Sequence, residues 1–184
     1  MVMPDTARHY TVDEVLAFPE DGNRYELVDG ELLVTPAPGT VHQMVVSRLF
    51  AELSSYLKGQ SELTVLPAPA DITWGGERLV QPDLFVIPAR DLSRSWKTVQ
   101  TLLLAIEVLS PSSARADRIV KRRLYQRQGV ETYWIVDPDA ALVEVWHPSD
   151  ERPEIVTEVL RWHGESRADA FEMNLSSLFG DLPR

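Results

Sequence analysis

The segment "TLLLAIEVLSPSSARADRIVKRRLYQRQGVETYWIVDP", residues 101–138, decides the fold that the sequence predicts. Its first part, 101–109, is a nearly continuous apolar run of strand length, which is typical of a central strand covered on both faces. Ser110-Pro111 ends the run, and residues 112–129 then predict a helix that Gly129 closes. The run "ETYWIV" predicts a second buried strand, and the order strand, helix, strand is typical of an α/β fold.

The chain before this segment predicts a hairpin and then a long helix. The runs "RYELV" and "ELLV" flank Asp29-Gly30, a pair typical of a type I′ turn, in which both residues need positive φ. Farther on, five apolar residues recur at intervals of four and predict a helix over about residues 40–58. These residues are Val41, Val45, Leu49, Leu53 and Leu57.

Short strands are predicted on both sides of the central segment. The runs "ELTVL", "ADITW" and "LFVI" precede it, and each is bounded by Pro or Gly. After it, "LVEVW" and "EIVTEVL" predict outer strands, and "LSSLFG" predicts a short terminal helix. We therefore expect one α/β domain over residues 1–184, in which helices flank a mixed sheet on both sides.

The composition narrows the classes of protein that fit this chain. It has 184 residues, 44% of them hydrophobic, which is enough for a sizeable core. It has no cysteine, so disulfides and thiolate metal sites are excluded and a cytoplasmic location is expected. No stretch approaches the roughly 18 apolar residues of a membrane helix. The net charge of −10 argues against a protein that coats nucleic acid generally, so any such contact must be local.

Two apolar strands each carry one acid, Asp83 in "QPDLFVIP" and Glu107 in "AIEVL". Strand alternation places Asp83 on the face of Phe85, and Glu107 on the face of Ala105. If the two strands are antiparallel neighbours, the two carboxylates meet and suit Mg²⁺ or Mn²⁺, with water completing the coordination. The alternative is that each acid lies at a strand end, where it is solvated or forms a salt bridge.

The helix after Glu107 supplies a third candidate, Lys121. On a wheel of 100° per residue, Lys121 lies beside the apolar sector that contains Ala116, Val120 and Leu124. It is therefore directed toward the sheet, where an amine could orient water or offset the charge of a phosphate. The alternative is a surface pair with Asp117, four residues earlier.

Positive charge is concentrated on the same helix, in a chain that is otherwise acidic. The wheel places Arg115, Arg118 and Arg122 on the side opposite the apolar sector, where they could bind a phosphate backbone. A solvated helix face explains the same pattern. By contrast, His9, His147 and His163 show no paired spacing that would predict a zinc site.

Several of these segments together resemble a known family. "RYELVDGELLV", "HQ", "QPDLFVI" and the block from "AIEVLSPSS" to "YWIVDP" are similar to the Uma-type restriction-endonuclease-like family of the PD-(D/E)xK nuclease superfamily. The resemblance covers about residues 24–146. It implies a restriction-endonuclease-like core of helix, three strands, helix and strand, to which this chain adds an N-terminal hairpin and C-terminal strands.

The resemblance also implies roles for individual residues. Asp83 and Glu107 correspond to the metal-binding acids, whereas Leu109 stands where the superfamily usually has its lysine. Lys121 matches a lysine displaced onto the following helix. Glu26, His42 and Gln43 match the family pattern and are possible auxiliary groups in the site. The alternatives are a packing or capping role for His42 and a surface position on the hairpin for Glu26. Asp117 is a further possible auxiliary residue. The resemblance implies a homodimer as well.

The sequence thus predicts a Mg²⁺- or Mn²⁺-dependent endonuclease that hydrolyses DNA. The alternative is a catalytically silent protein of nuclease fold that binds nucleic acid or a protein partner. If Asp83 and Glu107 repel each other without metal, neutralising Asp83 should stabilise the metal-free protein.

Overall fold

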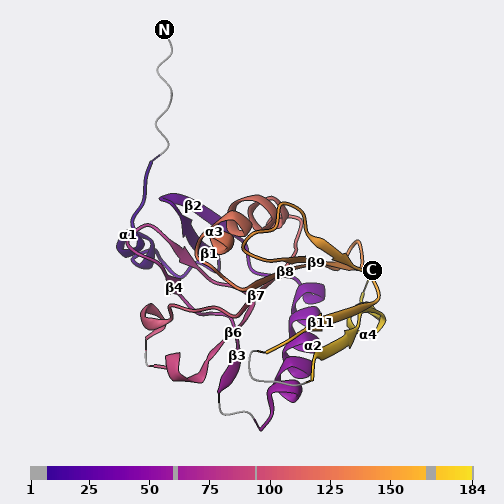
Figure 1. The fold of residues 1–184 in the computed structure, drawn as a ribbon. Helices are drawn as coiled ribbons and strands as arrows, with labels where there is room; N and C mark the ends of the chain where they lie inside the picture. The colour runs from indigo at the N-terminus through magenta and orange to yellow at the C-terminus, as the bar shows by residue number, and fades with distance from the viewer. Residues whose placement is uncertain (1–7, 60–61, 94, 165–168, 184) are drawn as a thin grey trace.

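The computed structural model describes residues 8–59, 62–93, 95–164 and 169–183, and its centre is a six-stranded mixed sheet (Figure 1). The strand order is β10-β9-β8-β7-β6-β3, and every neighbouring pair is antiparallel except β7 and β8. The strands are β3 (Leu63–Pro67), β6 (Leu84–Pro88), β7 (Leu104–Val108), β8 (Thr132–Asp137), β9 (Leu142–Trp146) and β10 (Glu154–Val156). This arrangement confirms the predicted α/β class with a mixed sheet.

Helices cover both faces of this sheet, as Figure 1 shows for α2 (Thr40–Leu57) and α3 (Arg122–Arg127). A π-helical segment, η3 (Ala116–Lys121), leads directly into α3, and the two form the crossover that the parallel pair β7–β8 requires. Two 3₁₀ turns, η1 (Ala89–Asp91) and η2 (Trp96–Thr98), lie between β6 and β7. In the part of the chain that the structure describes, no helix is long and apolar enough to cross a membrane.

The N-terminal hairpin belongs to a second, four-stranded sheet in the order β2-β1-β5-β4. Its strands are β1 (Arg24–Val28), β2 (Glu31–Thr35), β4 (Ile72–Thr73) and β5 (Leu79–Val80), and α1 (Val12–Leu16) packs against β1. Asp29 and Gly30 have φ of 50° and 81°, which confirms the predicted turn. The strand predicted for "ADITW" is present as β4, but it belongs to this second sheet, where it pairs with β5, a strand that the sequence did not predict.

The C-terminal region also differs from the prediction at one point. The run "EIVTEVL" was expected to be one outer strand, but it bends at Thr157 and Glu158 and supplies two sheets. Its first half is β10, whereas its second half begins β11 (Val159–Trp162), which pairs with β12 (Phe171–Asn174). The predicted terminal helix is present as α4 (Leu175–Phe179).

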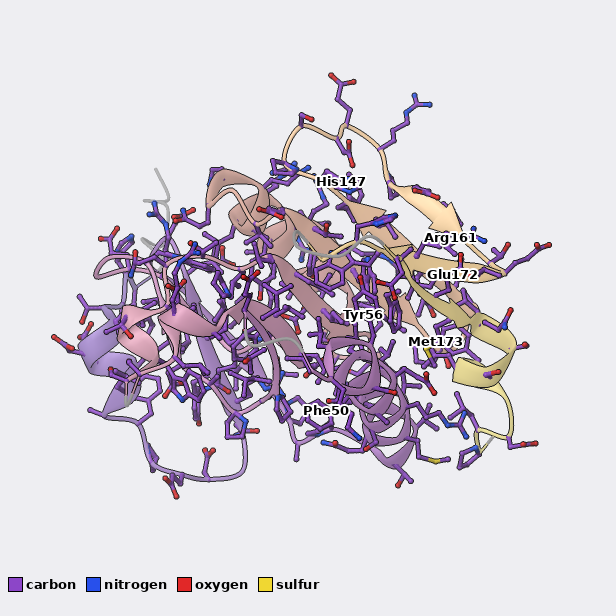
Figure 2. All side chains as sticks on the ribbon, turned by 60° about the horizontal axis from the view of Figure 1, so that its bottom comes forward. Phe50, Tyr56, His147, Arg161, Glu172 and Met173 are labelled. Carbon is purple, nitrogen blue, oxygen red and sulfur yellow. The ribbon has the colours of Figure 1, made fainter. Side chains whose placement is uncertain are left out.

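The β11–β12 hairpin lies over α2, as Figure 2 shows for Met173 of the hairpin and Tyr56 of the helix. The rings of Tyr56 and Phe171 pack edge to face, with their centroids 5.7 Å apart. The hairpin and α4 therefore complete the hydrophobic core on the α2 side of the sheet.

The central strands β6 and β7 are buried along their whole length because both faces of the sheet are covered. Leu84 and Val86 pack into the core on the α2 side, and Phe85 and Ile87 into the core on the α3 side. The alternation predicted for "DLFVI" is thus confirmed. Asp83 lies two residues before Phe85 on this strand, so its side chain points to the same side, toward α3 and the smaller sheet.

Candidate active site

Asp83 and Glu107 lie at neighbouring positions where β6 and β7 meet. The strands are antiparallel, with Leu84 opposite Ile106, so one step further along the register places Asp83 opposite Glu107. The backbone N–H of Val108 donates to Asp83 Oδ2 over 2.9 Å, which ties the end of one strand to the other. Both acids are almost completely buried, with exposures of 3% and 2%. The antiparallel juxtaposition expected from the sequence is therefore present.

The carboxylate of Asp83 is held by two basic side chains. Arg24 donates to Oδ1 over 2.8 Å, and His42 Nε2 lies 2.9 Å from Oδ2. Burial opposes the ionised form, but the bond with His42 and the charge of Arg24 outweigh it and lower the pKa of Asp83 to about 2. Asp83 is therefore a carboxylate at neutral pH.

The ammonium group of Lys121 lies among three carboxylates. Its Nζ is 2.6 Å from Glu26 Oε2, 3.1 Å from Glu107 Oε1 and 3.2 Å from Asp117 Oδ1. Burial disfavours the charged amine, but these three carboxylates raise the pKa of Lys121 well above its ordinary value. The side chain is 3% exposed, so Lys121 is a buried cation and not part of a surface pair with Asp117.

Glu107 lies between Lys121 and the other acids. Its Oε1 also accepts a hydrogen bond from the Tyr125 hydroxyl over 3.0 Å. Burial raises the pKa of Glu107 well above its usual range; Lys121 opposes this rise, and the negative charges of Asp117 and Asp83 add to it. The apo site therefore disfavours the ionised form of Glu107.

The site carries more negative than positive charge. Four carboxylates face two permanent cations, Arg24 and Lys121, so two negative charges are in excess when all the groups are ionised. The four acids are Glu26, Asp83, Glu107 and Asp117. An excess of this size in a buried site matches the charge of one divalent cation.

The same groups line one cavity of about 190 Å³. Two loops frame it, residues 35–39 between β2 and α2, and residues 110–113 after β7. Asp83, Glu107 and Lys121 all contribute to its lining. The expectation that these three side chains share one cleft thus agrees with the geometry, whereas their chemical roles belong to the proposal below.

Lys121 lies at the end of a π-helical segment. The N–H of Arg122 donates to the carbonyl of Asp117, five residues earlier, so the turn is wider than an α-turn. Asp117 and Lys121 occupy the buried side, while Ala116 and Val120 are only partly buried. The predicted apolar sector is thus confirmed in part, since Leu124 is fully buried and Val120 packs against the core, and Lys121 reaches Glu107 on β7 as its predicted direction toward the sheet requires.

The auxiliary residues predicted from the sequence divide into two groups. Glu26, His42 and Asp117 are buried and line the cavity, and the N–H of Gln81 donates to Glu26 Oε1 over 2.8 Å. Gln43 is exposed on α2 and is not among the residues that line the cavity. Gln43 is therefore not part of this site.

The three arginines predicted to contact nucleic acid do not line the cavity. Arg118 bonds Glu144 and Asp137 over 2.6 and 2.7 Å. Arg122 lies over the Trp146 ring, 4.5 Å from its centroid, and only Arg115 is exposed. Two of the three positive charges are therefore engaged within the fold.

Two residues that contact the acids directly were not predicted from the sequence, Arg24 and Tyr125. Strand alternation could have indicated Arg24, because it shares a face of β1 with Glu26. Tyr125 comes four residues after Lys121, which places it on the same side of a helix as the lysine. Nothing in the sequence indicates that Arg24 would bind Asp83, since that contact joins the two sheets.

The donor set fits magnesium better than zinc. Among the described residues, no three His, Asp or Glu side chains converge as a ready-made metal site. Mg²⁺ in nucleotide-processing enzymes is often held by one or two carboxylates, with water and phosphate as the remaining ligands. Asp83 and Glu107, together with the excess negative charge around them, match that requirement.

Comparison with known proteins then identifies the family. A family model described as "Uma2: Putative restriction endonuclease" matches residues 12–176. The chain belongs to the Uma2 family. Membership in Uma2 supports a nuclease function in general terms.

A crystal structure from Anabaena variabilis, described as a "putative nuclease belonging to DUF820", has a similar fold with a TM-score of 0.75. It shares 24% sequence identity, and the alignment covers 92% of this chain and 97% of the other. No curated protein matches the sequence at a significant level.

Proposed function

We propose that this Uma2 protein is a metal-dependent endonuclease that hydrolyses phosphodiester bonds in DNA. The observation that carries the proposal is the buried cavity in which Asp83, Glu107 and Lys121 meet, with carboxylates in excess of cations. Asp83 and Glu107 would hold Mg²⁺ or Mn²⁺. When bound, the ion polarises the phosphate and lowers the pKa of a coordinated water.

The residues of the chain have distinct roles in this proposal. Lys121 offsets the negative charge that develops on the phosphate in the transition state; donating to the attacking water would require its ammonium to release Glu107, which would then hold the metal. Glu26 and Asp117 hold the Lys121 ammonium in place through contacts of 2.6 and 3.2 Å. Arg24 and His42 orient the carboxylate of Asp83. The Tyr125 hydroxyl fixes one oxygen of Glu107 and leaves the other available for coordination.

The second candidate is a catalytically silent protein of nuclease fold. It is favoured by Leu109 at the usual lysine position, by the net charge of −10, and by the contacts that already engage both oxygens of Asp83. The two candidates differ in whether the acids bind a metal and whether DNA is cleaved.

The test combines metal binding with DNA cleavage. We expect millimolar Mn²⁺ to raise the melting temperature of the protein and to support nicking of a supercoiled plasmid. Asp83→Asn should lose both effects, whereas Glu52→Gln, which changes an exposed acid on α2, should keep both. A protein that shows no Mn²⁺-dependent stabilisation and no nicking would support the silent-binder candidate.

We also propose that the protein is a cytoplasmic homodimer. The absence of cysteine means that its stability does not depend on an oxidising compartment. β10 is an edge strand of the central sheet, and its Ile155 is 52% exposed, which favours pairing with a second copy. Light scattering that gave only a 20.8 kDa species across concentrations would contradict the dimer.

A further inference from the structure

A groove of about 720 Å³ adjoins the cavity of the candidate active site. It runs from the N-terminus of α2 past the loop after β7 to the β8–β9 turn and the C-terminal segment. Gly39, His42, Ser110 and Pro111 line both the groove and the cavity. A chain molecule bound in the groove can therefore continue to the buried acids.

The wall of the groove is largely apolar. Phe179 and Leu182 of the C-terminal segment face it together with Val41 and Leu109, and Asp139 is the one carboxylate among its lining residues. Phe179 is half-buried: it packs against the core on the α2 side and also lines the groove. Aromatic and apolar side chains of this kind stack on nucleobases without regard to base identity.

The start of α2 adds hydrogen-bond donors to this groove. α2 has 18 residues, begins after Gly39 without a side-chain cap, and has no acid in its first turn. The first helical bond is that of Gln43 N–H to the carbonyl of Gly39, so the N–H groups of residues 40–42 have no acceptor within the helix. Such donors, at the positive end of a helix, favour a phosphate group.

His42 independently points to a ligand at this position. Its side chain is about nine-tenths buried and lines both spaces, and one ring nitrogen bonds Asp83. Its other ring nitrogen, Nδ1, is buried and has no hydrogen-bond partner in the structure. A buried polar atom without a partner is unfavourable. Because the Asp83 carboxylate accepts the bond from Nε2, Nδ1 of the neutral ring is an acceptor, and a donor on a bound nucleotide, such as a base N–H, would satisfy it.

The burial of the acids bears on the strandedness of the substrate. Asp83 and Glu107 are 3% and 2% exposed, at the bottom of a cavity of about 190 Å³ between two loops. A duplex is a stiff rod over tens of base pairs, so its phosphates enter a narrow cavity only if it is deformed. A single strand bends freely, and its unstacked bases can enter an adjacent groove.

We propose that the groove binds the nucleotide next to the scissile phosphate, and that the substrate is single-stranded or locally unpaired DNA. The base would lie against Phe179 and Leu109, and its phosphate at the N–H groups of residues 40–42. This inference rests on the proposed nuclease function. It also explains how a chain with a net charge of −10 could bind DNA, since backbone donors and stacking replace a broad basic surface.

The test measures binding and cleavage separately. The binding probe is a fluorescein-labelled 12-nucleotide DNA of mixed sequence, compared with the same sequence as a duplex, with Ca²⁺ in place of Mg²⁺. We expect at least 10-fold tighter binding of the single strand. Thr40→Glu should weaken that binding at least 5-fold, because the added carboxylate lies at the phosphate position.

Two controls separate this effect from a change of fold or net charge. Ser47→Glu adds the same charge to an exposed position two turns further along α2, and it should leave binding unchanged. Thr40→Gln should also bind normally. Phe179→Leu keeps an apolar side chain but removes the stacking surface, so it should weaken single-strand binding about 5-fold while Mn²⁺-dependent stabilisation persists.

The outcomes distinguish the groove from the nuclease. Single-strand binding that depends on Thr40 and Phe179 supports the groove even if no DNA is cleaved. Equal affinity for duplex and single strand, or equal effects of Thr40→Glu and Ser47→Glu, would overturn it even if the protein nicks plasmids. Failure to bind either probe would overturn it as well.

Discussion

Lys121 and Glu26 form a buried ion pair of 2.6 Å between the helical crossover after β7 and the first strand of the smaller sheet. Lys121 is also in contact with Glu107 and Asp117, so one ammonium group offsets the charge of three carboxylates. Removing one partner of a buried pair is far more costly than removing a surface pair, because the remaining charges stay out of water. The contact therefore links the stability of the fold to the chemistry of the site.

Lys121→Ala should destabilise the metal-free protein by about 3–5 kcal/mol, because three buried carboxylates lose their cation. Mn²⁺ should recover part of that loss, since Asp83 and Glu107 remain in place. Plasmid nicking should disappear if Lys121 acts in the transition state. Urea denaturation with and without Mn²⁺ measures the first two effects, and stability equal to that of the unsubstituted protein would contradict the buried ion pairs.

Glu107→Gln should stabilise the metal-free protein at alkaline pH but not near pH 4.5. The pKa of Glu107 in the folded protein is raised above its usual value of 4.5. Protonated Glu107 therefore contributes to the free energy of unfolding below about pH 4.5, and this contribution is lost as the pH rises through the pKa of the folded state. Glutamine does not ionise and avoids this loss. We expect a melting temperature a few degrees above that of the parent at pH 8 without metal, and no further rise with Mn²⁺.

Asp83→Asn should have the opposite effect on the apo protein. The expectation from the sequence, that neutralising Asp83 relieves repulsion, does not fit the contacts with Arg24, His42 and the Val108 N–H. The pKa of Asp83 falls from 3.8 to about 2, so ionisation stabilises the fold above pH 3.8 by about 2 kcal/mol. The variant should lose this amount at pH 7, and the deficit should shrink as the pH falls through about 2.

Urea titrations of both carboxylate variants at pH 7 and pH 3 check these signs together. If Asp83→Asn proves more stable than the parent at pH 7, the pairing of Asp83 with Arg24 and His42 does not govern its charge.

Strand alternation was sufficient to place the two acids, because parity is a local property of an extended backbone. "DLFVI" and "AIEVL" could each be assigned an inward face, and antiparallel pairing then brought Asp83 beside Glu107. The partners of the acids could not be predicted in this way. Arg24 reaches Asp83 from another sheet, and that contact depends on how the two sheets pack.

The remaining differences arise where the backbone departs from regular geometry. Residues 116–121 form a π-helical segment, and no sequence pattern marked that wider turn, although the regular wheel already directed Lys121 toward the sheet. Similarly, Thr157 and Glu158 divide an apolar, strand-like run between two sheets without any Pro or Gly to indicate the bend. In both cases tertiary packing decides between local conformations of similar energy.

Arg118 and Arg115 should respond differently to the same substitution, although the sequence predicted a shared role in binding nucleic acid. Arg118 bonds Glu144 and Asp137, and Glu144 also accepts a hydrogen bond from Trp146, so Arg118→Gln should lower stability by about 1–2 kcal/mol. Arg115 is exposed, so Arg115→Gln should leave stability unchanged.

DNA binding should also distinguish the two arginines. If Arg115 contacts a phosphate, Arg115→Gln should reduce the slope of the logarithm of the DNA-binding constant against the logarithm of the salt concentration by about one unit. Arg118→Gln should leave that slope unchanged, and titrations with the single-stranded probe from 50 to about 200 mM salt would show whether the two arginines differ in this way.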